Sequence, residues 1–192
     1  MTLPSQYDIG FEKIHRDFIE VQRATFLKDF VPPHGMVLDI GNQGKANPGG
    51  DFKIKTLDIS AATQPDYIAD ITTYNAHISS CSFDAIMCAE VLEHVVDPFA
   101  ATEELYRILR RGGFMFVSVP LNARIHGPVP DCWRFTEFGL KVIFRDWTIV
   151  CLKKLDTPDR NLFPLHYALV LRKDSDSLKM SDPRVMKFQK VD

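Results

Sequence analysis

The sequence lacks a long apolar run and a paired cysteine motif. No apolar run is long enough to cross a bilayer, and residues 1–10 mix Pro4, Asp8 and Gly10 with apolar positions, unlike the core of a signal peptide. The four cysteines stand far apart and form no CxxC pair, which argues against structural zinc and against a secreted disulfide framework. We therefore expect a cytoplasmic protein that does not act at a membrane.

A strong excess of charge of one sign is also missing. The formal net charge is -2, so nothing in the composition predicts a nucleic-acid partner. The 192 residues suffice for one domain with a substantial core. We predict a single domain over residues 1–172, followed by a polar tail over residues 173–192. The sequence leaves the oligomeric state open.

Apolar periodicity predicts an N-terminal amphipathic helix. Phe11, Ile14, Phe18 and Val21 recur at steps of three and four residues, and the pattern ends before Pro32. After that helix, short apolar runs bounded by glycine, proline or acidic residues predict strands. Seven strands are expected, at residues 36–41, 52–58, 67–69, 83–89, 114–119, 147–155 and 167–172.

A further helix is predicted between the fourth and fifth strands. Asp97 can cap it and Pro98 suits its first position. It is expected to continue through Arg110 and Arg111, where cations suit the negative end of the helix, and to stop at Gly112.

Thr136 is expected to cap another helix, with Leu140, Ile143 and Phe144 facing inward. Strands that alternate with helices predict an α/β fold. We expect a doubly wound, mostly parallel seven-stranded sheet with helices on both faces. In such sheets ligands bind beyond the carboxyl ends of the strands.

Acidic residues stand at the ends of the first two predicted strands. Asp58 ends the second strand and can accept hydrogen bonds from both hydroxyls of a ribose. Asp39 ends the first strand, where a carboxylate would repel a pyrophosphate but suits a ligand with an ammonium and a sulfonium. The loop after it lacks the GxGxxG spacing. The residues favour an adenosyl ligand over a dinucleotide, and a dinucleotide-dependent oxidoreductase is the less favoured alternative.

The segments VLDIG, TLDIS, YIADI and FDAIMCAEVLEHVVDPFAATEELYRILRRGGFMFVSVP resemble successive motifs of class I S-adenosylmethionine-dependent methyltransferases, most closely the methyltransferase type 11 group. The resemblance implies a Rossmann-like fold, S-adenosylmethionine as cofactor and methyl transfer as the activity. It places Asp39 and Gly41 by the methionine moiety, Asp58 at the ribose and Asp70 at the adenine edge. The cofactor-binding residues that it implies are Asp39, Gly41, Asn42, Asp58, Ile59, Asp70, Ile71, Glu90 and Val91.

The glycine loop departs from the family pattern. Typical members carry a glycine where this chain has Gln43, and Gly44 is out of register with that pattern. This departure leaves open an alternative function, in which a methyltransferase-like protein has lost catalysis and serves as a binding subunit.

Glu90 and His94 stand four residues apart and could face one metal ion. No third ligand is evident near them in the sequence, so a helix cap or a supporting hydrogen bond is the favoured interpretation. We expect no metal and predict that the activity survives chelation.

Residues 121–135 form a long connection after the fifth predicted strand, which is typical of a lid or a binding loop. An acceptor hydroxyl must lose a proton, and His126 is the first candidate for the base, with Asp131 orienting it or serving instead. Trp133 could line the pocket or stack on a sugar, and Arg134 could hold an acidic substituent. The alternatives are a core role for Trp133, an Arg134–Asp131 brace and a turn-capping role for His126.

The string WRFT, with His126 and Asp131 shortly before it, is similar to methyltransferases of glycan and polysaccharide biosynthesis. That similarity implies O-methylation of a small hydroxylated acceptor, with a sugar or glycan first in line.

Overall fold

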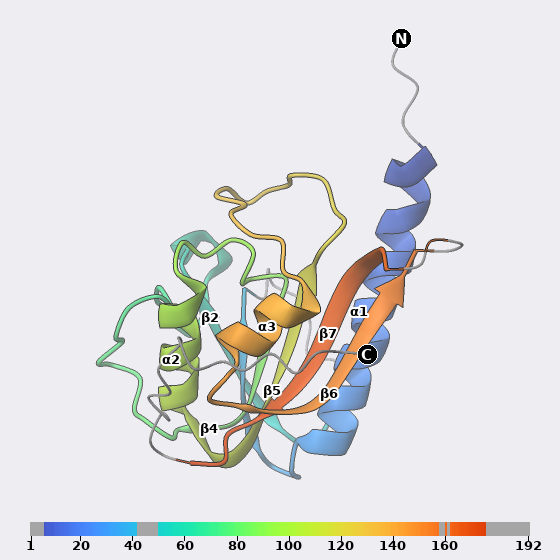
Figure 1. Cartoon of the computed structure of the whole chain (residues 1–192). Coiled ribbons are helices and arrows are strands. Elements are labelled where there is room, and N and C mark those ends of the chain that lie inside the picture. The colour runs from blue at the N-terminus through green and yellow to red at the C-terminus, as the bar shows by residue number, and fades with distance from the viewer. Residues whose placement is uncertain (1–5, 42–49, 158–159, 161, 176–192) are drawn as a thin grey trace.

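The structure is a computed structural model that describes residues 6–41, 50–157, 160 and 162–175 (Figure 1). Its centre is a seven-stranded sheet in the order β3-β2-β1-β4-β5-β7-β6. The strands are β1 (Met36–Ile40), β2 (Lys53–Asp58), β3 (Tyr67–Ile68), β4 (Phe83–Ala89), β5 (Leu109–Pro120), β6 (Thr148–Asp156) and β7 (Pro164–Arg172). The helices are α1 (Gln6–Phe30), α2 (Pro98–Ile108) and α3 (Glu137–Ile143), with a short 3-10 helix at Ala61–Thr63.

Strand direction divides the sheet into two parts. Strands β1 to β5 pair in parallel, whereas β7 is antiparallel to both β5 and β6. The predicted doubly wound, mostly parallel seven-stranded sheet is therefore confirmed. Because β7 is reversed, its first residues lie at the edge where the parallel strands end.

Helices cover both faces of the sheet (Figure 1). Phe26 of α1 packs on one face, in a cluster that includes Met87 and Phe116. Leu105 of α2 and Leu140 of α3 pack on the other face. Successive strand residues alternate between the two clusters, as the pleat of a sheet requires.

The apolar stripe of α1 differs from the predicted one. Ile14 is 45% exposed and Val21 is 59% exposed, whereas Phe26 is fully buried. The helix packs on the sheet through its C-terminal half, where the Phe26 ring contacts Phe116 and the Phe30 ring contacts Phe114. These aromatic contacts fix the rotation of the helix on the sheet.

The ends of α2 confirm one prediction and correct another. Asp97 caps the helix, its Oδ1 accepting hydrogen bonds from the amides of Phe99 and Ala100 at 3.0 Å. The helix ends at Ile108, before the predicted stop at Gly112, because Leu109 already pairs with β4 as the first residue of β5.

Two further positions, Thr136 and Lys173, bear on the predicted elements. Thr136 caps α3 through a 3.1 Å hydrogen bond from the Gly139 amide, as expected. Lys173 was expected to begin the polar tail, but it is buried and its Nζ donates to the carbonyl of Leu109 at 2.8 Å. No helix among the described residues is long and apolar enough to cross a bilayer.

Candidate cofactor and acceptor site

Two adjoining cavities lie beyond the carboxyl ends of β1, β2 and β4. The first, which we call the cofactor cavity, has a volume of about 230 Å³. The predicted cofactor residues that line it are Gly41, Asp58, Ile59, Asp70, Ile71, Glu90 and Val91. Asn42 lies outside the described residues. The edge of the sheet thus brings together residues from the ends of four strands, β1, β2, β3 and β4, as the strand order requires.

Gly41 shapes the point where β1 ends. Its φ of +67° lies in the left-handed region, and a Cβ there would stand 2.9 Å from Cγ2 of Val91. A side chain would therefore strain the backbone and press on the wall of the cofactor cavity.

Two carboxylates of the cofactor cavity are held by the turns that follow them. Oδ1 of Asp58 accepts a hydrogen bond from the Ser60 amide at 2.7 Å. Oδ1 of Asp70 accepts from the amide and the hydroxyl of Thr72 at 2.8 and 2.7 Å. In both residues the hydrogen bonds use one oxygen, so the other can accept hydrogen bonds from a ligand.

Asp39 lies deeper, against α1. Its carboxylate is buried and forms a 2.9 Å ion pair with Nη2 of Arg23, which is also buried. Arg23 already balances the negative charge of Asp39. A ligand ammonium at Asp39 would therefore meet an ion pair and not an isolated carboxylate. The pair ties α1 to the end of β1.

The second cavity, which we call the histidine cavity, has a volume of about 460 Å³. Three histidines line it, His15, His94 and His126. It shares Ile40, Gly41, Glu90, His94 and Pro128 with the cofactor cavity. A ligand in one cavity is thus in direct reach of a ligand in the other.

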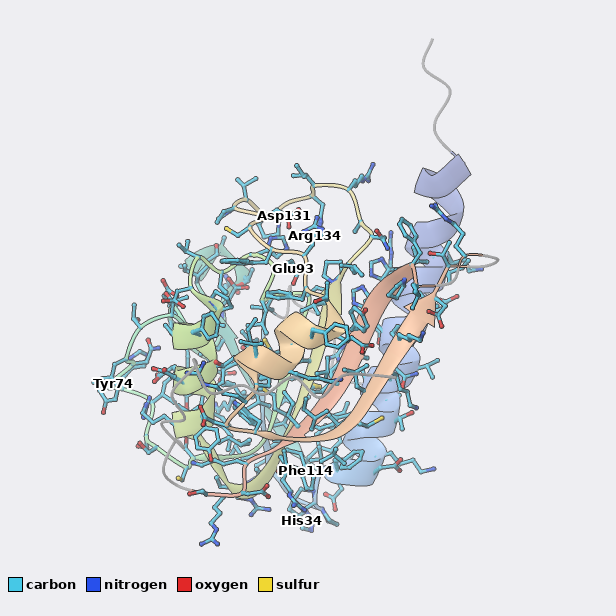
Figure 2. All side chains as sticks on the ribbon, in the orientation of Figure 1. His34, Tyr74, Glu93, Phe114, Asp131 and Arg134 are labelled. Carbon is cyan, nitrogen blue, oxygen red and sulfur yellow. The ribbon has the colours of Figure 1, made fainter. Side chains whose placement is uncertain are left out.

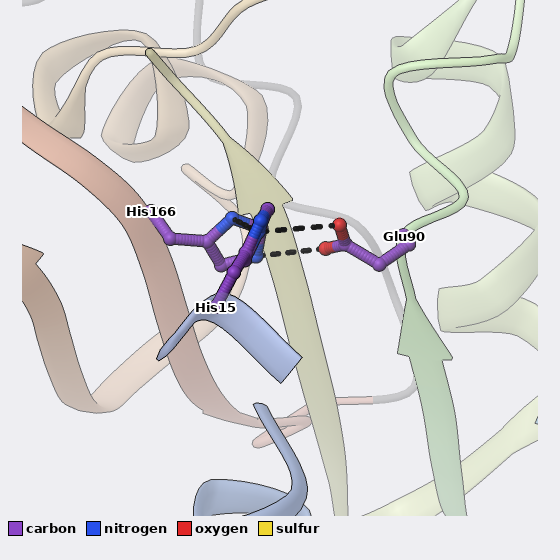
Figure 3. A group of neighbouring side chains, drawn as sticks. All are labelled: His15, Glu90 and His166. Atoms are coloured by element: carbon purple, nitrogen blue, oxygen red, sulfur yellow. Dashed lines mark hydrogen bonds and ion pairs between the residues drawn. The ribbon is translucent and has the colours of Figure 1, made fainter. Parts of the chain in front are cut away.

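Glu90 stands at the junction of the two cavities, with two histidines beside it (Figure 3). Its φ of +56° is unusual for a residue with a side chain and indicates local strain. Oε1 lies 2.7 Å from Nε2 of His166, and Oε2 lies 3.6 Å from Nε2 of His15. Nε2 of His15 in turn lies 2.5 Å from Nδ1 of His166. Sequence analysis missed both histidines, because they lie on α1 and β7, far from Glu90 in the chain.

The ionisation of this group follows from its burial and its contacts. Burial favours the neutral form of Glu90, but the contact with His166 and the Coulombic effect of both histidines hold the pKa of its carboxyl below the ordinary value. Burial, and then the neighbouring His166, lower the pKa of His15 to about 4. His15 is therefore neutral at physiological pH.

The loop of residues 121–135 is braced by an internal ion pair. Nη1 and Nη2 of Arg134 contact the two oxygens of Asp131 at 2.5 and 2.7 Å, and the guanidinium also donates to the carbonyl of Arg124. Arg134 lines neither cavity, so the structure favours the brace over the predicted contact with an acidic substituent. The hydrogen bond from Arg134 holds the pKa of Asp131 well below its usual range, which makes this carboxylate unsuitable as a base.

Trp133 lies outside both cavities. It is 40% exposed, its Nε1 donates to the carbonyl of Val95 at 2.8 Å, and its ring stacks on Phe135. Its position fits neither of the predicted roles, which were to line the pocket or to anchor the core. Trp133 fastens the loop to the turn that follows β4.

His126 does reach the histidine cavity, and it meets His94 and Glu93 there. Nδ1 of His126 lies 3.2 Å from the carbonyl of Arg124, and Nδ1 of His94 lies 3.0 Å from the carbonyl of Pro130. Nε2 of His126 and Nε2 of His94 lie 3.8 and 3.9 Å from Oε1 of Glu93. Figure 2 shows Glu93 beneath the loop, near Asp131 and Arg134.

Glu93 is the site residue that sequence analysis overlooked. Its side chain is fully buried, and its backbone carbonyl accepts hydrogen bonds from the amides of Cys132 and Trp133. Burial, and then the nearby Glu90, raise the pKa of its carboxyl well above the ordinary value. Among the described residues the fold gathers two groups of three possible metal ligands, His15–Glu90–His166 and Glu93–His94–His126, and Glu90 and His94 belong to different groups.

Comparisons with known proteins agree with this geometry. Residues 51–117 match the family described as "Methyltransferase domain", in its type 11 group. The predicted resemblance to the methyltransferase type 11 group is therefore confirmed for this part of the chain, and solved methyltransferases share its fold.

Curated relatives of this chain are named ubiquinone biosynthesis O-methyltransferase. The protein of Paracidovorax citrulli (strain AAC00-1) is 29% identical over 127 residues, which cover 56% of this chain and 52% of that protein. The protein of Xanthomonas oryzae pv. oryzae (strain PXO99A) is 38% identical over 60 residues, which cover 31% of this chain and 25% of that protein. The chain thus spans between a quarter and about half of the length of these relatives.

Solved structures share the fold of this chain at low identity. An S-adenosylmethionine-dependent methyltransferase from Archaeoglobus fulgidus superposes with a TM-score of 0.63 at 15% identity, covering 88% of this chain and 100% of the other. The 1,6-didemethyltoxoflavin-N1-methyltransferase of Burkholderia thailandensis, solved with S-adenosylhomocysteine, gives 0.60 at 16% identity, covering 91% and 92%.

Proposed function

We propose that this protein transfers a methyl group from S-adenosylmethionine to an oxygen of a small hydroxylated acceptor. The observation that carries the proposal is the pair of adjoining cavities at the carboxyl edge of the sheet, joined at Gly41 and Glu90. Methyl transfer requires a nucleophile aligned with the sulfonium carbon, and two ligands that meet at one boundary satisfy that requirement.

The cofactor cavity provides the groups that an adenosyl ligand needs. Asp58 has a carboxylate oxygen available for the ribose hydroxyls, and Asp70 and Ile71 stand next to each other for the adenine edge. The methionine end would lie toward Gly41 and the Arg23–Asp39 pair, which offers one charge of each sign to its carboxylate and its ammonium.

The histidine cavity provides the place for the acceptor. In it, His126 presents Nε2, because Nδ1 faces a backbone carbonyl that can only accept a hydrogen bond. A neutral imidazole in this orientation can accept the proton of a hydroxyl, which typically contributes about 10²–10⁴-fold. Asp131 supports it by accepting a 2.8 Å hydrogen bond from the His126 amide.

The lining of the histidine cavity favours a polar acceptor. The side chains of Arg16, Glu20 and Glu90 accompany the histidines, and no phenylalanine, tyrosine or tryptophan is among its described lining residues. Hydroxyl groups of a sugar suit such a surface better than a bare aromatic ring does. The O-methyltransferase names of the curated relatives support oxygen as the methylated atom. A sugar or glycan is the first acceptor to test.

The two alternatives have less support. An inactive binding subunit was suggested by the loop around Gln43, which lies outside the described residues. A dinucleotide-dependent oxidoreductase would need the phosphate-binding glycine loop that the sequence lacks, and the family match favours methyl transfer.

Calorimetry with S-adenosylmethionine and S-adenosylhomocysteine tests the cofactor half. Loss of a charge-assisted contact in Asp58→Ala should cost about 1.5–3 kcal/mol, which corresponds to a roughly 10- to 150-fold weaker affinity. Asp156→Ala is the matched control, since Asp156 is an exposed residue at the end of β6 that lines neither cavity. No heat with either ligand at a folded wild-type protein would refute the cofactor assignment.

Labelled methyl transfer to a panel of sugars, phenols, amines and peptides tests the acceptor half. His126→Ala should keep the cofactor affinity and lower turnover by about two orders of magnitude or more. Full turnover in that variant, or a clear preference for a peptide, would contradict the proposed acceptor site.

A further inference from the structure

We propose that Glu93, His94 and His126 bind a divalent transition-metal ion in the wall of the histidine cavity. The three side chains come from the turn after β4 and from the loop of residues 121–135. His94 and His126 both line the cavity, so an ion between them is open to a ligand there.

The first argument is the orientation of the two imidazole rings. In each ring Nδ1 faces a backbone carbonyl, that of Pro130 for His94 and that of Arg124 for His126. A carbonyl only accepts hydrogen bonds, so Nδ1 carries the hydrogen, and Nε2 of the neutral ring is left with a lone pair. A hydrogen bond from Nδ1 to a backbone carbonyl is also the usual way in which metal-binding histidines are held.

The second argument is the carboxylate of Glu93. Its side chain is fully buried, and neither of its oxygens accepts a hydrogen bond from the described part of the chain. Burying a charge without a partner is costly, so groups of this kind are normally paired or bound to a metal. The histidine nitrogens at 3.8 and 3.9 Å are beyond hydrogen-bond distance.

Together these groups place three potential ligand atoms face to face, and a proton on the neutral form of Glu93 would have no acceptor within hydrogen-bond distance among the described residues. Oε1 of Glu93 and the ligand atoms of the two histidines lie within 4.8 Å of one another. Bonds of about 2.0–2.1 Å to a tetrahedral ion would bring neighbouring ligand atoms to roughly 3.3–3.4 Å. The two Glu93–histidine distances of 3.8 and 3.9 Å would therefore have to shorten by about half an ångström. A cation between the three atoms would bind all of them at once.

The other three-residue group, His15, Glu90 and His166, differs in this respect. Nε2 of His15 lies 2.5 Å from Nδ1 of His166, and Nε2 of His166 lies 2.7 Å from Oε1 of Glu90, although the second contact lacks the geometry of a hydrogen bond. Glu90 therefore has a histidine nitrogen at 2.7 Å, which Glu93 lacks, so an ion is less needed in this group.

The ligand chemistry identifies the class of ion. Two imidazoles and one carboxylate suit Zn²⁺ and its neighbours Fe²⁺, Co²⁺ and Ni²⁺ rather than Ca²⁺ or Mg²⁺. Three protein ligands leave a coordination position open, as in sites that act on a ligand.

The purpose of the ion depends on the proposed function, whereas its binding does not. Positive charge at this wall would favour the ionised form of an acceptor hydroxyl. His126 would then hold the ion and would not itself take the proton, so the two roles of this residue exclude each other. Measuring turnover after removal of the ion distinguishes the role of His126 as a metal ligand from its role as a base.

The experiment uses the full chain without an affinity tag, stripped by a chelator and titrated with Zn²⁺ and with Co²⁺. We expect one Zn²⁺ per chain by calorimetry, a rise in Tm with Zn²⁺, and a visible Co²⁺ absorption band of a low-coordinate site. Glu93→Gln and His94→Ala should each weaken Zn²⁺ binding by about 100-fold or more and lose that band. Glu93→Gln keeps the shape of the side chain, so its metal-free Tm should not fall below that of the wild type.

His15→Ala is the matched control and should bind Zn²⁺ like the wild type. No stoichiometric Zn²⁺ binding, or wild-type binding in both Glu93→Gln and His94→Ala, would overturn the inference. So would loss of the ion in His15→Ala alone, which would assign it to the other group. Failure of cofactor binding would instead refute the proposed function and leave these results unchanged.

Discussion

Replacing Arg23 by methionine should destabilise the protein strongly, because it removes the guanidinium that forms a buried ion pair with the Asp39 carboxylate. The two side chains are only 9% and 6% exposed, and 2.9 Å separates Nη2 from Oδ2. Removing one member of such a pair costs about 3–5 kcal/mol, mostly through the charge that is left behind. For a chain of this size, that loss lowers Tm by roughly 6–20 °C.

Thermal and urea unfolding followed by circular dichroism measure this loss. Lys28→Met is the control, because Lys28 is an exposed cation in the last turn of the same helix and should cost less than about 1 kcal/mol. The double variant Arg23→Met/Asp39→Asn should recover part of the stability, since it removes the stranded charge as well. A free energy of unfolding for Arg23→Met within about 1 kcal/mol of the wild type would refute this reasoning.

Three further predictions concern the site and its loop. Gly41→Ala should lose about 1–2 kcal/mol of stability from its φ of +67° and bind S-adenosylmethionine at least tenfold more weakly; unchanged calorimetry would contradict the place of Gly41 in the cofactor cavity. Asp131 has a lowered pKa in the folded state, so its stabilisation is present above its unfolded pKa of about 3.9 and is lost as the pH falls further. The urea midpoint should therefore fall more steeply between about pH 5 and 3 for the wild type than for Asp131→Asn, and parallel curves would exclude the Arg134 brace. Trp133→Phe should lower the free energy of unfolding by about 0.5–1.5 kcal/mol, because the hydrogen bond to Val95 is lost, and it should leave the acceptor KM unchanged. A raised KM would indicate that Trp133 contacts the acceptor.

Local signals in the sequence were sufficient for much of the fold. The strand at residues 83–89 has the predicted bounds, because a short apolar run between turn residues admits few alternatives. Asp97 and Thr136 cap their helices as predicted, since capping depends on neighbours within three residues. The family resemblance implied the seven described cofactor residues that line one cavity, and they gather there because parallel strands end at the same edge of the sheet.

The parts that could not be predicted depend on contacts between distant residues. Arg110 seemed suited to a helix end, but its guanidinium pairs with Asp84 at 2.6 Å within the sheet. The contact between His15 and His166 joins residues 151 positions apart. No periodicity in the sequence encodes which face of α1 meets β7, so neither this contact nor the buried Arg23 could be found before the fold was known.

The reversed direction of β7 makes the position of His166 insensitive to the length of the preceding turn. His166 is paired with Pro120 on one side and with Leu155 on the other, so two neighbouring strands set its height in the sheet. Insertions between Asp156 and Pro164 would lengthen the hairpin outside this pairing and leave the imidazole where it is. Homologues could therefore differ in hairpin length and still present a histidine to Glu90, which makes the interval from Glu90 to His166 a poor criterion for recognising this site in other sequences.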